Sequence, residues 1–179
     1  HALFEYFKNQ NYIKENFIER IQRTLKPIEI IDDKDLRIMF DYLRIHNREH
    51  YYFLMFLLIT GFRISTAVAL SWEQIDFNKM LIYADNIKKN RGFVFPLTND
   101  LIKLLGEIGI KEKGKVFNFK STEGLKFFPQ LQKRLISLGL IKRHYTLHQF
   151  RKTFVTKMLE AGVYICDVSK LAVIKTYKR

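Results

Sequence analysis

Cysteine is almost absent from this sequence of 179 residues, which contains a single one, Cys166. One thiol cannot form an intramolecular disulfide or a cysteine-rich zinc site, so we expect a reducing, cytosolic compartment. We expect Cys166 itself to be a small residue of the core.

Long apolar runs are also absent. The longest, from Tyr51 to Ile59, lies in the middle of the chain and is too short to cross a bilayer. The N-terminus does not have the shape of a signal peptide. We therefore expect a soluble cytoplasmic protein with no membrane partner.

Acidic residues are scarce beside basic ones: 18 Asp and Glu stand against 31 Lys and Arg, a net charge of +13. Such an excess favours a polyanionic partner, most commonly nucleic acid, over a surface charged only for solubility or for anionic membranes. The acidic group Asp32, Asp33 and Asp35 lies where a helix should begin, and helix capping explains it. We therefore expect no metal site, and positive side chains that supply the electrostatics.

The pattern of apolar residues predicts a mainly helical α+β domain with a small antiparallel three-stranded sheet. Gly61 is the expected C-cap of a buried central helix. Residues 3–24 form an interrupted helical pattern that ends near Pro27, so we divide the chain into 1–27 and 28–179. Helices are expected near residues 32–43, 49–60, 67–72, 99–105, 127–138, 147–161 and 167–172, and strands near 77–83, 93–96 and 116–117.

One predicted helix carries chemistry. Residues 147–162 read LHQFRKTFVTKMLEAG, and His148 and Arg151 lie three residues apart on one helical face. A guanidinium grips two phosphate oxygens while an imidazole can donate or accept a proton, so the pair suits a phosphate. The alternative is a solvated polar face near a helix start.

A second segment lies upstream, where residues 60–77 read TGFRISTAVALSWEQIDF. Arg63 follows the predicted cap at Gly61; considered alone, an arginine at this position is more simply explained as a surface residue after a helix cap. Together the two segments resemble, in order and spacing, the two box motifs of the tyrosine recombinase (phage integrase) family. The resemblance covers roughly residues 28–177, the catalytic domain of that family, and implies its fold.

The resemblance implies a DNA-breaking and rejoining enzyme that needs no cofactor. Arg63 and Arg151 would clamp the scissile phosphate and His148 would shuttle protons. Lys88, with Lys89 as the alternate, would protonate the leaving 5′ oxygen. Tyr177 would attack the phosphate to form a 3′-phosphotyrosyl intermediate, which keeps the bond energy for rejoining.

The partner implied is double-stranded DNA, bound by a monomer that forms a tetramer on paired DNA sites in the cytoplasmic nucleoid. Residues 1–27 would be the end of a core-binding domain or a linker helix. The basic residues expected to contact DNA are Lys89, Arg91, Lys142, Arg143, His144 and Lys152; a hairpin tip carrying Lys88, Lys89 and Arg91 can also serve only as a phosphate-contacting loop.

The sequence departs from the family pattern in three places. Thr66 stands where a glutamate is usual, and Leu171-Ala172 stands where Leu-Gly-His is expected. Tyr177 follows Arg151 by 26 residues, fewer than is usual, which we interpret as a missing loop; otherwise the nucleophile lies elsewhere or Tyr177 is structural. Two other hypotheses remain, a catalytically impaired DNA-binding module and a type IB topoisomerase-like enzyme.

Overall fold

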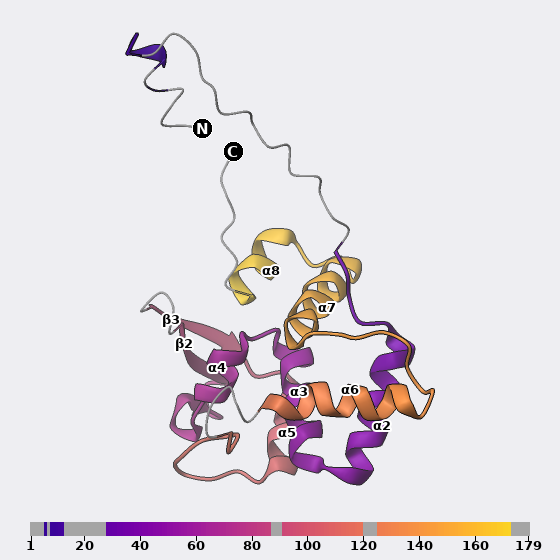
Figure 1. Cartoon of the computed structure of the whole chain (residues 1–179). Coiled ribbons are helices and arrows are strands. Elements are labelled where there is room, and N and C mark those ends of the chain that lie inside the picture. Colours follow the sequence, from indigo (N-terminus) through magenta and orange to yellow (C-terminus); the bar gives the residue numbers. More distant parts are fainter. Residues whose placement is uncertain (1–5, 7, 13–27, 87–90, 120–124, 173–179) are drawn as a thin grey trace.

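The computed structural model describes residues 6, 8–12, 28–86, 91–119 and 125–172 (Figure 1). It confirms a mainly helical domain with a small antiparallel three-stranded sheet. The elements, in chain order, are α2 (Asp33–His46), α3 (Arg48–Thr60), α4 (Ile64–Ala69), the 3-10 helix η1 (Trp72–Gln74), β1 (Ile75–Asp76), β2 (Leu81–Asn86), β3 (Arg91–Pro96), α5 (Asn99–Ile108), α6 (Phe127–Ser137), α7 (Leu147–Glu160) and α8 (Ile165–Leu171).

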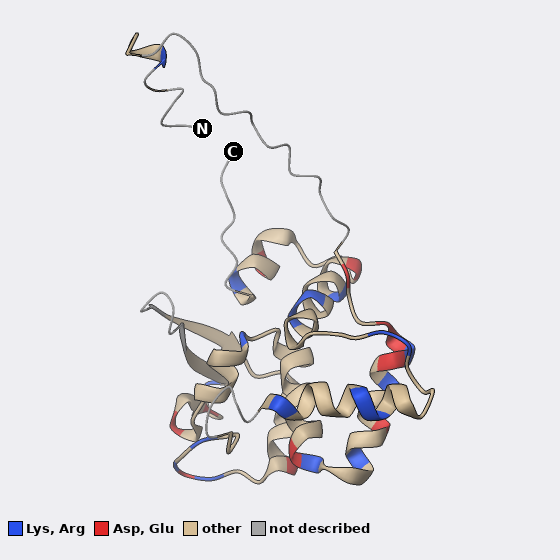
Figure 2. Ribbon diagram, in the orientation of Figure 1, with Lys and Arg blue, Asp and Glu red and all other residues tan. Residues whose placement is uncertain are grey.

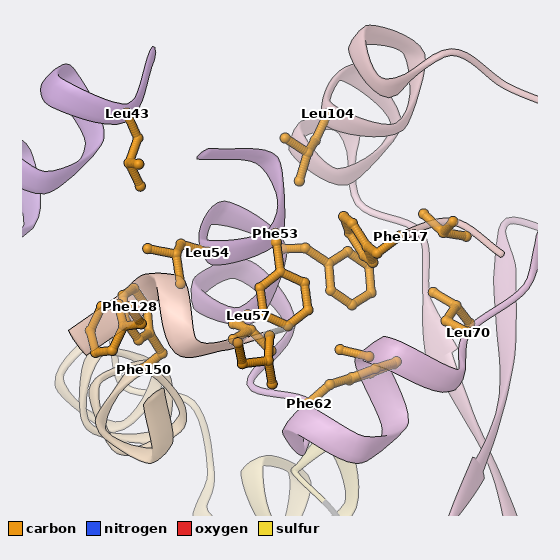
Figure 3. Close-up of a cluster of buried hydrophobic side chains, with 14 of the residues drawn as sticks. Leu43, Phe53, Leu54, Leu57, Phe62, Leu70, Leu104, Phe117, Phe128 and Phe150 are labelled. Carbon is orange, nitrogen blue, oxygen red and sulfur yellow. The ribbon is translucent and has the colours of Figure 1, made fainter. Parts of the chain in front are cut away.

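Helix α3 is the centre of the core, as its nearly continuous apolar sequence predicts. It packs against α2, α5 and α7 and buries both faces (Figure 3). The residues that it buries completely or almost so are Phe53, Leu54, Phe56, Leu57 and Thr60. Its predicted C-cap is confirmed, because Gly61 has the left-handed φ of 60°.

The sheet has the order β1-β2-β3, and its third strand is not the predicted one. Ile75 pairs with Ile82 in β1, whereas Val116 and Phe117 lie outside the sheet. The Phe117 ring packs edge-on against Phe53 of α3 instead. The apolar character of Val116 and Phe117 therefore predicted their burial correctly, but the strand predicted for them was wrong.

Two further boundaries differ from the prediction. The strand expected from Phe77 begins at Leu81, after a turn, and turns Ile82 and Ala84 inward. The strand expected from Phe93 begins at Arg91.

The helix expected at residues 67–72 is α4, which begins and ends three residues earlier. Arg63 is its N-cap, with extended backbone. The helix ends at Ala69 because Leu70 is extended and its carbonyl accepts a hydrogen bond from the Val116 N–H. The first helical residue is therefore the one that follows Arg63.

Cys166 was predicted to be buried, and it is exposed. It lies on α8, which buries Val168 and Ser169 and ends at the buried C-cap Ala172. A thiol at the first turn of this helix points away from that face. The residue type favoured burial, but the helical face decided against it.

No helix in the described part of the chain combines the length and the apolar character needed to span a lipid bilayer. Most of residues 1–27 lies outside the described residues, and the division of the chain at residue 27 stays a prediction.

Candidate active site

A reciprocal capping box between Thr146 and Gln149 fixes where helix α7 begins. The side chain of Gln149 accepts a hydrogen bond from the Thr146 N–H at 2.6 Å, which forms a capping box. His148, the second residue of the helix, is exposed at its open end. Arg151, one turn later, is buried, with an exposed fraction of 8%.

The segment that leads into α7 is held by buried polar contacts. The Gln132 side chain accepts from the Tyr145 N–H at 2.5 Å and donates to the Tyr145 carbonyl at 2.9 Å. The Tyr145 hydroxyl donates to Asp35 at 2.8 Å. Basic positions lie along this segment and on α7 (Figure 2).

Arg63 stands where the central helix ends. The Thr60 hydroxyl donates to the Phe56 carbonyl at 2.7 Å and accepts from the Phe62 N–H at 3.2 Å, which shapes the exit from α3. Phe62 is buried against the rings of Phe56 and Phe95. Arg63 is therefore held by the packing of the residue before it, and its own side chain is half-buried.

The two sequence segments meet at Gly61. The Arg151 guanidinium donates to the Gly61 carbonyl at 2.7 Å and also to the Ala172 carbonyl at the end of α8. The ring of Phe154 lies so close that a Cβ on Gly61 would be 2.3 Å from its Cδ1. Arg151 thus joins α3, α7 and α8 at one point.

The cationic groups lie close enough to affect one another's pKa values. Burial lowers the pKa of Arg151 to about 10, and the positive charge of Arg63 adds to this effect. Burial also lowers the pKa of His148, helped by the charges of Arg151, Lys152 and Arg63. Positive groups held this close together favour the binding of an anion.

The structure therefore brings together Arg63, His148 and Arg151, three of the five predicted catalytic residues. The other two, Lys88 and Tyr177, lie outside the described residues, as does Lys89. Arg91 begins β3. The remaining residues predicted to bind DNA lie before or on α7: Lys142, Arg143 and His144 are exposed and Lys152 is half-buried.

Sequence reasoning missed the residues that support the site. Gln132 is 2% exposed on the α6 face that also buries Phe128, Leu131 and Leu135. A polar residue at a core position of an amphipathic helix is a signal that it has a specific partner. The partner, Tyr145, is 13 residues away and cannot be read from the pattern.

Among the residues that the structure describes, no group of three or more His, Cys, Asp or Glu lies close enough to hold a metal ion. The acidic group at the start of α2 has other roles. Asp32 caps the helix, Asp33 pairs with Lys157 at 2.5 Å, and Asp35 accepts from Tyr145.

The class of protein follows from a family comparison: residues 29–172 match the phage integrase family, and the chain belongs to it. These are the tyrosine recombinases that the two sequence segments resemble. Among curated proteins, it is 25% identical over 207 residues to a probable integrase/recombinase of Acholeplasma phage L2, covering 96% of this chain and 70% of that protein.

Solved structures share the fold at low sequence identity. The integrase of transposon Tn1549 bound to circular intermediate DNA has a TM-score of 0.65 at 15% identity, over 98% of this chain and 68% of that one. The catalytic domain of bacteriophage HP1 integrase has a TM-score of 0.63 at 18% identity, over 83% and 82%. A lambda integrase tetramer bound to a Holliday junction has a TM-score of 0.66 at 12% identity, over 98% and 56%.

Proposed function

We propose that this chain is the catalytic domain of a site-specific DNA recombinase, which cleaves and rejoins double-stranded DNA through a 3′-phosphotyrosyl intermediate. The observation that carries the proposal is the convergence of Arg63, His148 and Arg151, two arginines and an imidazole from segments far apart in the chain. Family membership and relatives solved on DNA support it.

The geometry suits the charge that develops in phosphoryl transfer. A guanidinium has five N–H donors, and Arg151 gives one each to the Gly61 and Ala172 carbonyls. This orients the group while leaving up to three donors for a phosphate. Because these interactions are formed before the substrate arrives, they stabilise the transition state without reorganisation.

The lowered pKa of His148 suits a proton acceptor. Its pKa is lowered, so the imidazole is largely neutral near pH 7. A bound phosphate would offset part of the local positive charge and raise that pKa, which lets His148 take up a proton during attack. In this proposal Tyr177 is the nucleophile and Lys88 protonates the leaving 5′ oxygen.

DNA affinity in this proposal comes from the basic segment before α7. Lys142, Arg143 and His144 are exposed there and Lys152 follows on α7; Lys89 and Arg91 would add contacts from the β2–β3 hairpin. Contacts to phosphates make affinity fall steeply with salt. A flat salt response in a DNA-binding titration would argue against DNA as the partner.

The proposal is tested with a pool of nicked DNA duplexes of randomised sequence, radiolabelled so that covalent adducts can be followed. Wild type should form an adduct in which the radiolabel stays attached to the protein after denaturation. The control Tyr164→Phe, at an exposed tyrosine, should do the same. Tyr177→Phe and Arg63→Ala should give none. An adduct with Tyr177→Phe would place the nucleophile elsewhere.

The same experiment separates the alternatives. DNA binding without any adduct would indicate a catalytically impaired binding module, which the Leu171-Ala172 departure favours. Relaxation of supercoiled plasmid that lacks a specific site would indicate topoisomerase-like activity. Sedimentation should find a monomer without DNA and a tetramer on paired sites; a stable tetramer without DNA would contradict that expectation.

A further inference from the structure

The residue just before the N-cap of α7 is held by its backbone. Gln132, buried on α6, bonds both the N–H and the carbonyl of Tyr145, at 2.5 and 2.9 Å. Two directional bonds to one residue fix both the position and the orientation of its peptide groups. The Gln132 side chain thus makes the pair of backbone hydrogen bonds that a neighbouring β-strand would make.

The side chain of Tyr145 is held as well. Its hydroxyl donates to Asp35 at 2.8 Å, across 110 positions of sequence. Burial, and then this bond, raise the pKa of Tyr145 to about 12. Tyr145 is therefore attached to α6 through its backbone and to α2 through its phenol.

What this attachment controls is the start of α7. Thr146 follows Tyr145 directly and carries the capping box with Gln149. His148 is three residues beyond Tyr145, with no hinge between them other than the cap. A shift of Tyr145 would therefore move His148 relative to Arg63, which belongs to a different segment.

We propose that Gln132 and Asp35 are positioning residues, which hold Tyr145 so that His148 stands beside Arg63 and the basic segment from Lys142 to His144 is presented beside the site. The chemical part of this inference rests on the proposed recombinase function. The geometric part does not.

The face of α6 that contains Gln132 is otherwise apolar, with Phe128, Leu131 and Leu135. A buried amide is unfavourable unless its bonds are made. Here those bonds also satisfy the buried N–H and carbonyl of Tyr145, which an apolar side chain of similar size would leave unpaired. What the amide adds is direction, and the direction is toward the helix that carries His148.

The test compares Gln132→Met and Tyr145→Phe with Leu104→Ala, which truncates a buried side chain on α5, a helix packed against α3. The readout is the His148 pKa from NMR of histidine-labelled protein, with the signal assigned by His148→Gln. Arg151 and Lys152 move with α7, so a change reports on burial and on the distance from Arg63.

We expect the His148 pKa to rise toward its ordinary value of about 6.5 in Gln132→Met, to rise less in Tyr145→Phe, and to stay unchanged in Leu104→Ala. An unchanged pKa in Gln132→Met would overturn the proposal. If that variant does not fold, Tyr145→Phe decides, because its ring and both backbone bonds remain.

Adduct formation on the randomised nicked duplexes gives the second readout. Gln132→Met should form the adduct roughly tenfold to 100-fold more slowly than Leu104→Ala. If no protein forms an adduct, wild type included, yet the His148 pKa shifts, the recombinase function fails and the positioning role stands. Equal adduct rates with an unshifted pKa overturn the positioning role and leave the function intact.

Discussion

The segment that carries Arg63 and the helix that carries Arg151 meet at one site, but they are anchored by different chemistry. The first is held mainly by aromatic packing, beside the two local hydrogen bonds of Thr60: the Phe62 ring lies 5.4 Å from that of Phe56 and 5.1 Å from that of Phe95, centre to centre. The second is held by hydrogen bonds, from Gln132 and Asp35 before the helix and from Thr153 within it.

Thr153 shows the contrast clearly. Its buried hydroxyl accepts from the Ile31 N–H at 3.0 Å and donates to the Gln149 carbonyl at 2.8 Å, which ties α7 to the chain just before α2. Apolar contact is not directional and fixes where a segment lies, whereas hydrogen bonds also fix its orientation. The first segment thus supplies a position, and the second supplies an oriented helix.

Gly61, where the two segments meet, should be the position at which a substitution lowers stability most. Gly61→Ala combines a left-handed φ of 60° with a contact of 2.3 Å to the Phe154 ring, so we expect a loss of about 3 kcal/mol in the free energy of unfolding. Gly139→Ala is the matched control. Its φ is 69°, but a Cβ added there would meet no atom of a non-neighbouring residue within 4 Å, so the substitution should cost about 1 kcal/mol. Urea denaturation measures both, and equal losses would contradict the close packing.

The two arginines should separate activity from stability. Arg151→Ala leaves the Gly61 and Ala172 carbonyls without their donor, and release of a buried charge offsets part of that loss, so we expect about 2 kcal/mol. Arg63→Ala should cost less than about 1 kcal/mol. Both variants should lose adduct formation. If Arg63→Ala proves as destabilising as Arg151→Ala, the contrast between the two anchors is wrong.

The outermost polar contact of the α7 anchor should contribute little. Lys157 and Asp33 lie 2.5 Å apart, but both side chains remain largely exposed. A double-mutant cycle with Lys157→Ala and Asp33→Ala should give a coupling below about 1 kcal/mol that decreases with salt. A larger coupling that persists in salt would show that α7 is held from its outer face as well.

Two histidines, His50 and His148, differ in which nearby charges act on their pKa values. His50 of α3 stacks on Phe127 of α6, and burial lowers its pKa while the nearby Glu49 opposes the shift. The pKa of His148 is lowered by burial and by surrounding positive charge. Added salt screens charge, so NMR titration should show the His148 pKa rising and the His50 pKa constant or slightly lower.

The sign of the effect on stability is the same for both. Each folded pKa lies below the unfolded value of about 6.5, so the contribution to stability is present above that pH and is lost as the pH falls through the folded pKa. His148→Gln should reduce this acid-dependent loss slightly, since the residue is exposed. A steeper loss in the variant would contradict the direction of the shift.

The sequence was informative wherever one residue type has one local use. Asp32 caps α2 and Gly61 caps α3, as predicted; a nearly continuous apolar sequence located α3 correctly, and apolar periodicity located α7. It failed for β1, because a strand of two residues has no periodicity to detect. For Phe117 the ambiguity was between a strand and a buried loop, which only packing on α3 resolves.

For the candidate site, too, the sequence predicted one part and only the structure supplied the other. The motifs selected Arg63, His148 and Arg151, and their convergence is a tertiary fact that the motifs could only suggest. The bond from Arg151 to Gly61 joins residues 90 positions apart. Lys88 and Tyr177 stay predictions.

The bond between Arg151 and the Ala172 carbonyl has a mechanical consequence. It pins the end of α8 to the same guanidinium that faces the candidate phosphate. Tyr177 follows Ala172 by five residues, and a stretch of that length reaches at most roughly 17 Å even when fully extended. With the sequence as it stands, the contact at Ala172 therefore sets an upper limit on the distance between position 177 and Arg151.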